Sequence, residues 1–201
     1  NNRVLSLVSY DGRLVAGGFF DSVAGSAANG IAQWDGATWS PLGSDLQAGS
    51  IVLTLIVHEG ALIAGGGLAT PGMPGGNIAR WDGSSWLTLG SGTNATVTSL
   101  VAYNGQLIAA GHFSVAGGMP VDHIAAWDGN SWSSLGNGVF GPVHSLAVHG
   151  GVLIVGGRFS HAGSAVPSVN LARWDGSDWS SLDSRMDGSV LTLNVHDGDL
   201  F

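Results

Sequence analysis

The 201-residue sequence contains no cysteine and no lysine, and its six basic residues are all arginine. Without cysteine, the chain can form no disulfide and can use no thiolate as a nucleophile or metal ligand. The net charge of −8 and the lack of a basic stripe argue against nucleic-acid binding, because phosphate contacts need clustered cations. No apolar run approaches the roughly 18 residues of a membrane-spanning helix, so we expect no membrane insertion.

Glycine, in contrast, is abundant, with 34 residues, and it often follows aspartate. Seven of the thirteen aspartates directly precede a glycine. Asp-Gly is a preferred pair for a two-residue β-hairpin turn. Most of the negative charge is therefore predicted to belong to turns, which is a better explanation than an acidic ligand-binding surface.

A tryptophan-containing segment is repeated along the chain. IARWDGSSWLTLG, residues 78–90, has near-copies that begin at residues 31, 124 and 171, and residues 190–201 resemble the opening of the chain. The first tryptophans of the four copies are 47, 46 and 47 residues apart. A fixed period of this size indicates a repeat architecture. The predicted organisation is four full repeats and the start of a fifth, with approximate bounds 4–51, 52–96, 97–142, 143–189 and 190–201.

Each repeat contains four strand signals. An alternating segment such as 97–103 is followed by a two-residue turn, a glycine-containing strand, a loop of about ten residues and an Asp-Gly hairpin. Four short antiparallel strands at this period predict an all-β fold, a β-propeller of four-stranded antiparallel kelch-like blades. Residues 1–201 are then a single propeller domain or a fragment of a larger one. A fifth start would leave an extra strand exposed, so we expect a longer array, or self-association that completes the ring.

The tryptophan hairpin is predicted to be structural. With Asp82-Gly83 as a two-residue turn, Trp86 would lie opposite Ala79, and a small partner would leave room for the indole. All eight tryptophans of the chain occupy the two positions that flank this turn, and we expect them to fill the cores of the blades. They are Trp34, Trp39, Trp81, Trp86, Trp127, Trp132, Trp174 and Trp179.

One glycine recurs in the second strand of every full repeat, as Gly18, Gly66, Gly111 and Gly157. Glycine inside a strand marks a bulge or a close approach of another chain segment. We expect a large aromatic side chain of a neighbouring strand or blade to cover these positions. A phosphate-binding loop is excluded because a strand, and not a helix, contains the glycines.

These motifs resemble the kelch repeat of galactose-oxidase-like propellers. The segment 153–182, which contains LIVGGRFS and NLARWDGSDWSSL, is more similar to WDG-type repeats of bacterial secreted and surface proteins and of the fungal cortical polarity marker family. The resemblance implies a bacterial protein with an extracellular or cell-surface location. It implies no copper enzyme, because the copper site of galactose oxidase uses a Cys-linked tyrosine and this chain has no cysteine.

The variable loops are the predicted interaction surface. Connections in an antiparallel meander alternate between the two ends of the strands, so the tight turns share one end and the long loops share the other. The long loops differ most between repeats, and variable loops on a rigid scaffold are where binding normally resides. The side chains expected to be exposed for contact are Met73, Met119, Phe140 and Met186.

Histidine is the remaining residue type whose side chains could bind a metal ion. Four residues flank corresponding long loops and could converge on a metal ion, the alternative being ordinary surface polarity. They are His112, Asp122, His123 and His161. No catalytic triad stands out and no cofactor motif is present, so we expect neither catalytic residues nor a cofactor.

The function expected from these observations is a non-enzymatic extracellular or cell-surface module, structural or adhesive, that contacts a protein or glycan through its long loops. The first alternative is a carbohydrate-binding, lectin-like propeller. The second is a hydrolase or lyase with its site at the central channel. That alternative would require charged groups near the axis, whereas charged residues make up 10% of the chain and lie mostly in turns.

Overall fold

The computed structural model describes residues 3–44, 46–69, 76–164, 166–182 and 186–201. The chain divides into two compact units, residues 1–97 and 98–201. The described residues form strands and turns and no helix, so none of them forms a helix that could cross a bilayer.

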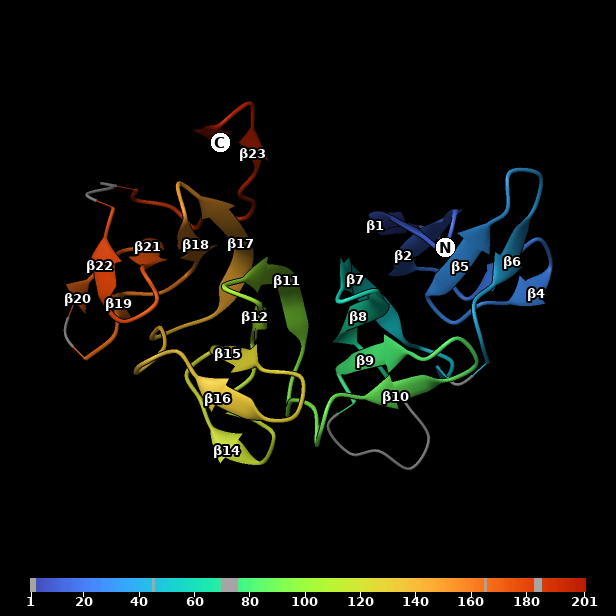
Figure 1. The fold of residues 1–201 in the computed structure, drawn as a ribbon, viewed down its shortest axis with the longest axis horizontal. Coiled ribbons are helices and arrows are strands. Elements are labelled where there is room, and N and C mark those ends of the chain that lie inside the picture. The colour runs from blue at the N-terminus through green and yellow to red at the C-terminus, as the bar shows by residue number, and fades with distance from the viewer. Residues whose placement is uncertain (1–2, 45, 70–75, 165, 183–185) are drawn as a thin grey trace. The chain divides into compact units, whose positions relative to one another are not determined.

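Unit 1 contains two four-stranded antiparallel sheets, called blades 1 and 2 (Figure 1). In each sheet, neighbouring strands follow one another in the order of the four main strands along the chain. Blade 1 consists of β1 (Arg3–Tyr10), β2 (Arg13–Phe19), β5 (Ile31–Trp34) and β6 (Trp39–Pro41). Blade 2 consists of β7 (Ile51–His58), β8 (Ala61–Gly67), β9 (Ile78–Trp81) and β10 (Trp86–Thr88).

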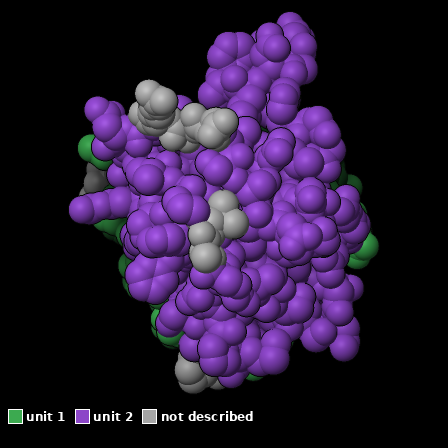
Figure 2. Space-filling model, turned by 90° about the vertical axis from the view of Figure 1, so that its left-hand side faces the viewer, with its two compact units in different colours: residues 1–97 green, residues 98–201 purple. Residues whose placement is uncertain are grey.

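Unit 2 repeats this arrangement as blades 3 and 4. Blade 3 consists of β11 (Val97–Tyr103), β12 (Gln106–Gly111), β15 (Ile124–Trp127) and β16 (Trp132–Ser134). Blade 4 consists of β17 (Val143–His149), β18 (Val152–Gly157), β21 (Leu171–Trp174) and β22 (Trp179–Ser181). The start of the fifth repeat forms the hairpin of β23 (Val195–His196) and β24 (Asp199–Leu200), which projects from the purple surface in Figure 2.

The tryptophan hairpin differs from the prediction in its register. Trp86 pairs with Trp81 and not with Ala79, which lies opposite Thr88. The turn contains four residues and not two, because the Asp82 N–H donates to the Ser85 carbonyl and the Asp82 carboxylate accepts the N–H groups of residues 84 and 85. The aspartate therefore builds the turn with its side chain, which the two-residue prediction overlooked.

The same register occurs in all four hairpins. In each one the two tryptophan rings meet across the strands, with centroids 5.2 to 5.7 Å apart and planes tilted by 45° to 51°. The same register places Arg173 opposite Ser180. The Arg173 Nε donates to the Ser180 hydroxyl at 2.8 Å.

The recurring glycines are covered by backbone and valine, so the prediction of an aromatic cover is wrong. A β-bulge lies in the first strand beside Gly18, Gly66 and Gly157. A Cβ on Gly66 would overlap the carbonyl oxygen of Ile51. The preceding glycine is covered by a valine of the next repeat: Val52 lies on Gly17 in unit 1, and Val190 lies on Gly156 in unit 2. Glycine is required because the backbone of the first strand and the next blade both approach closely.

Two kinds of hydrogen bond also join the neighbouring blades within a unit. The Trp86 Nε1 of blade 2 donates to the Leu42 carbonyl of blade 1 at 3.0 Å, and Trp179 makes the same bond to Leu135 in unit 2 at 2.9 Å. In the first strands, the Ser6 hydroxyl accepts the N–H of Leu55 at 3.0 Å. In each unit, a cluster of buried side chains therefore spans both blades. It includes Trp81 and Trp86 in unit 1, and Trp174 and Trp179 in unit 2.

Five tryptophans are buried: Trp81, Trp86, Trp132, Trp174 and Trp179. Trp34, Trp39 and Trp127 are half-buried. The burial of the hairpin tryptophans therefore differs from blade to blade.

Candidate interaction surface at the long-loop end

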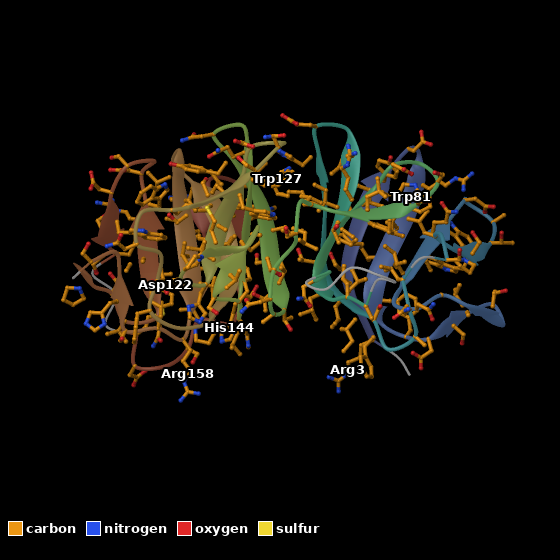
Figure 3. All side chains as sticks on the ribbon, turned by 90° about the horizontal axis from the view of Figure 1, so that it is seen from below. Arg3, Trp81, Asp122, Trp127, His144 and Arg158 are labelled. Carbon is orange, nitrogen blue, oxygen red and sulfur yellow. The ribbon has the colours of Figure 1, made fainter. Side chains whose placement is uncertain are left out.

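The two ends of the strands differ in their polar chemistry. The tight turns lie at one end and the long loops at the other, as the antiparallel order requires. In unit 2, Figure 3 places Trp127 toward the turn end, and Asp122, His144 and Arg158 toward the loop end. In unit 1, the same figure places Trp81 toward the turn end and Arg3 toward the loop end.

At the turn end, the hairpin aspartates are occupied by their own turns. The Asp128 carboxylate accepts the N–H of Ser131 at 2.7 Å and the N–H of Asn130 at 2.8 Å. These backbone hydrogen bonds are the main cause of a lowered pKa at each hairpin aspartate, since they stabilise the charged form. The residues affected are Asp35, Asp82, Asp128 and Asp175. They are ionised acceptors and not proton donors.

At the loop end, three of the long loops that follow the second strand contain a small hairpin, where the sequence predicted irregular loops. The hairpins are β3 (Ser22–Val23) with β4 (Ser26–Ala27), β13 (Val115–Ala116) with β14 (Met119–Pro120), and β19 (His161–Ala162) with β20 (Val166–Pro167). Their turns use left-handed backbone at Ala24, Gly25, Gly117, Gly118 and Gly163. The Ala-Gly and Gly-Gly pairs were the sequence signal for these hairpins.

A recurring side chain before the third strand fastens one long loop to the next. The Asn77 side chain donates to the Thr93 carbonyl at 2.8 Å, and Asn170 donates to the Gly188 carbonyl at 2.9 Å. His123 takes this position in blade 3, where its Nδ1 lies 3.2 Å from the Val139 carbonyl. Sequence reasoning missed this framework role, although the repeated asparagine before a strand was visible.

The loops of unit 2 are also fastened to one another by their backbones. The Val139 N–H donates to the Asp122 carbonyl at 3.0 Å, and the Phe140 N–H donates to the His161 carbonyl at 2.9 Å. The Gly163 N–H donates to the Gly138 carbonyl at 2.8 Å. These bonds hold the loops together as one preorganised platform.

The predicted contact residues have different environments. Phe140 is 72% exposed, and its ring meets the edge of His161 at a centroid distance of 6.5 Å. Met119, at the tip of a small hairpin, and Met186 are both about half exposed. Met73 lies outside the described residues.

Phe140 borders a hollow of about 440 Å³ on this platform. Its lining combines the exposed Phe140 ring with the acidic residue Asp122 and the polar residues Asn137 and Ser134. The lining residues are Pro120, Val121, Asp122, Ser134, Gly136, Asn137, Phe140 and Gly163. This combination provides an apolar anchor and adjacent hydrogen-bonding groups, which is the composition of a recognition surface.

The four candidate metal ligands have different surroundings, and Asp122 lines the hollow beside Phe140. His123 faces the Val139 carbonyl, and His161 lies 2.8 Å from the Ser160 hydroxyl through its Nδ1. His112 packs against His144, with ring centroids 5.9 Å apart. Within the described ranges, no group of three or more His, Cys, Asp or Glu side chains could hold a metal ion.

Comparison with known proteins agrees with the fold. A model of the family described as a domain of unknown function, DUF5122 beta-propeller, matches residues 11–33. Comparison with curated protein sequences gives no significant match. The chain is thus all-β, built from four-stranded antiparallel sheets, and propeller-like in its repeats.

Solved structures with a similar fold align to most or all of the chain. One similar structure is described as the extracellular domain of a hybrid two-component system, BT4673, from B. thetaiotaomicron, with a TM-score of 0.63 and 13% identity. The alignment includes all of the present chain, which spans only 26% of the length of that structure.

The computationally designed Ika8 protein has a TM-score of 0.54 at 15% identity, with coverage of 98% of this chain and 66% of its own. The designed Ika4 protein has a TM-score of 0.51 at 16% identity, with coverage of 86% and 90%. At these identities the similarity concerns the fold.

Proposed function

We propose that the protein is a non-enzymatic binding module of the cell exterior that contacts a protein partner through the long loops of unit 2. The observation that carries this proposal is Phe140, a large aromatic side chain 72% exposed on a loop whose backbone is fixed on both sides. Exposed aromatic residues on rigid elements are frequent anchors of protein interfaces, because they bury a large area at little entropic cost.

The absence of catalysis is part of the proposal. The hairpin aspartates are hydrogen-bonded within their own turns, and their lowered pKa values keep them ionised. A general acid needs a carboxyl group whose pKa is raised toward the working pH. These aspartates are therefore unsuited to proton transfer.

The location and the larger architecture are proposed on similarity. The WDG-type repeats resemble those of secreted and surface proteins, and one similar solved structure is an extracellular domain. We propose that the repeats are kelch-like blades of a longer array or of a ring completed by self-association. The first strand of blade 1 supports this, because its apolar residues Val4 and Leu7 are exposed.

A second function, glycan binding, is favoured by one observation. The Phe140 ring stands beside Asp122, Asn137 and Ser134 at the rim of the same hollow. An aromatic ring can stack on a sugar ring, while adjacent carboxylate and amide oxygens accept hydrogen bonds from the sugar hydroxyl groups.

The test screens the chain in parallel against a displayed library of extracellular protein domains and against a glycan array. A protein ligand should bind the double variant Met119→Ser/Phe140→Ser at least about tenfold more weakly than the original chain. The matched control is Leu87→Ser, which removes an exposed leucine from strand β10 of unit 1.

The outcomes separate the two functions. A glycan ligand that depends on Phe140 would replace the protein-binding proposal by glycan binding. Ligands that are lost with Leu87→Ser and retained by the double variant would contradict both.

A further inference from the structure

Three basic side chains gather at the loop end of the first and second strands of unit 2. His112 directly follows β12, His144 is the second residue of β17, and Arg158 directly follows β18. The rings of His112 and His144 have centroids 5.9 Å apart and planes tilted by 53°. Figure 3 shows His144 and Arg158 at the same end of the strands, with the arginine side chain pointing outward.

The backbone holds these residues together. The Thr98 hydroxyl lies 3.1 Å from the Ala110 carbonyl and 2.7 Å from the Val143 carbonyl, so it bridges the strands that carry the two histidines. The Arg158 N–H donates to the Pro142 carbonyl at 2.8 Å, two residues before His144. The packing of blade 4 against blade 3 therefore brings the backbones of these residues together, so their proximity does not depend on flexible side chains alone.

The charges of this cluster are not compensated within the described structure. Among the described residues, the ion pair that forms is between His196 and Asp197, and no carboxylate lies within ion-pair distance of the three basic side chains. Burial is the main cause that lowers the pKa of His144, and the positive charges of His112 and Arg158 lower it further. Like charges held together without a counter-ion favour an anion at this place.

A metal ion is the less suitable ligand. Two imidazoles fall short of the three or four protein ligands that zinc sites use. The permanent positive charge of Arg158 beside them repels a cation, whereas its planar group suits a carboxylate, sulfate or phosphate.

We propose that His112, His144 and Arg158 form a binding site for an oxyanion group of an acidic ligand, with an affinity that rises as the pH falls. The bound anion stabilises the protonated imidazoles, so binding takes up protons. The site uses none of the residues of the Phe140 surface, and it does not depend on the function proposed above.

The experiment titrates the full chain with sodium sulfate while nuclear magnetic resonance follows the histidine ring signals. Sodium chloride keeps the ionic strength constant, because salt alone weakens the repulsion among the cations and would raise the pKa of His144. Sulfate should shift the rings of His112 and His144, and should bind about tenfold more tightly near pH 5.5 than near pH 7.5.

Variants test the assignment of the residues. Arg158→Gln and His144→Gln should each weaken sulfate binding about tenfold. The matched controls keep it: His149→Gln lies at the other end of the same strand, β17, and Arg173→Gln removes an arginine from the outer hairpin. The Phe140→Ser variant should also bind sulfate normally, which separates this site from the loop surface.

Three results would overturn the proposal. Sulfate could shift the rings of His149 and His196 as much as those of His112 and His144. The control variants could weaken binding as much as Arg158→Gln does. Zinc chloride could shift the two rings at a concentration where sulfate leaves them unchanged. The wild-type titration needs no variant, so the proposal remains testable if His144→Gln does not fold.

Discussion

Blades 1 and 2 are built from near-identical patterns, yet their first strands have opposite environments. Val52 of blade 2 is completely buried and Leu55 is 8% exposed, whereas the corresponding Val4 and Leu7 of blade 1 are 56% and 58% exposed. The reason is the neighbour. Val52 and Leu55 lie against Gly17 of blade 1, and within unit 1 no preceding blade covers Val4 and Leu7 in the same way.

The fourth strands show the same contrast. Trp86 of blade 2 is 2% exposed and bonded to Leu42 of blade 1. Trp39 of blade 1 is half-buried and borders an open, mostly apolar hollow of about 230 Å³ that Val4 also lines. A blade of this type therefore supplies one side of a core layer, and the adjacent blade supplies the other side.

The largest expected difference in stability is between substitutions of Trp86 and Trp39, which are the second tryptophans of the hairpins in blades 2 and 1. Trp86→Ala should lower the free energy of unfolding by about 3–5 kcal/mol, because it leaves a cavity between blades and removes the bond to Leu42. Trp39→Ala should cost only about 1–2 kcal/mol, because its ring is partly in solvent. Urea denaturation followed by circular dichroism measures both. Equal losses would mean that blade 1 is covered in solution, as by a second copy of the chain.

A smaller difference in stability is expected between substitutions of Val52 and Val4, which occupy the same position in their repeats. Val52→Ala deletes two buried methyl groups and should cost about 1.5–3 kcal/mol. Val4→Ala should stay within about 0.5 kcal/mol of the original chain. The same denaturation assay measures both, at several protein concentrations. A concentration-dependent loss with Val4→Ala would reveal an interface between copies at this strand.

The smallest expected effect is a pH dependence that blades 1 and 2 should share. Backbone hydrogen bonds lower the pKa of Asp35 and Asp82 below the ordinary value of 3.8. Their contribution to stability is therefore complete above that value and is lost as the pH falls through the folded-state pKa. Asp35→Asn and Asp82→Asn should each remove part of the loss of stability below about pH 4, since asparagine can still accept the N–H bonds but does not titrate.

The urea midpoint, measured between about pH 7 and about pH 2.5, checks this prediction. The two variants should differ from the original chain by similar amounts, because the turn is local and does not involve the neighbouring blade. A much larger effect for Asp82 than for Asp35 would show that packing between blades reaches the turns.

Much of the fold followed from local patterns in the sequence. The repeat period, the order of strands within a blade and the separation of tight turns from long loops were predictable, because each depends on alternation and turn residues near in sequence. The register of the hairpin was not, because the Asp82 carboxylate competes with the backbone for the N–H groups of Ser84 and Ser85. The glycine pairs indicated a close approach, but not that Val52 would make it.

The candidate sites were less predictable than the fold. The exposure of Met119, Phe140 and Met186 agrees with the expectation from variable loops. The backbone bonds that fix Phe140 were invisible in the sequence, and so was the meeting of His112 with His144. These two histidines lie 32 positions apart in the sequence, and only the packing of blade 4 on blade 3 brings them together.

The sequence by itself determined the strands, the turns and the repeat, because alternation and Asx turns act over a few residues. The tertiary structure alone decided which copy of each repeated side chain is buried, and which polar groups meet at the blade junctions. The physical reason is that a side chain is buried only where a second surface packs against its own. Val4 and Val52 are the same residue in the same local pattern, and the presence of a neighbouring blade gives them different energies.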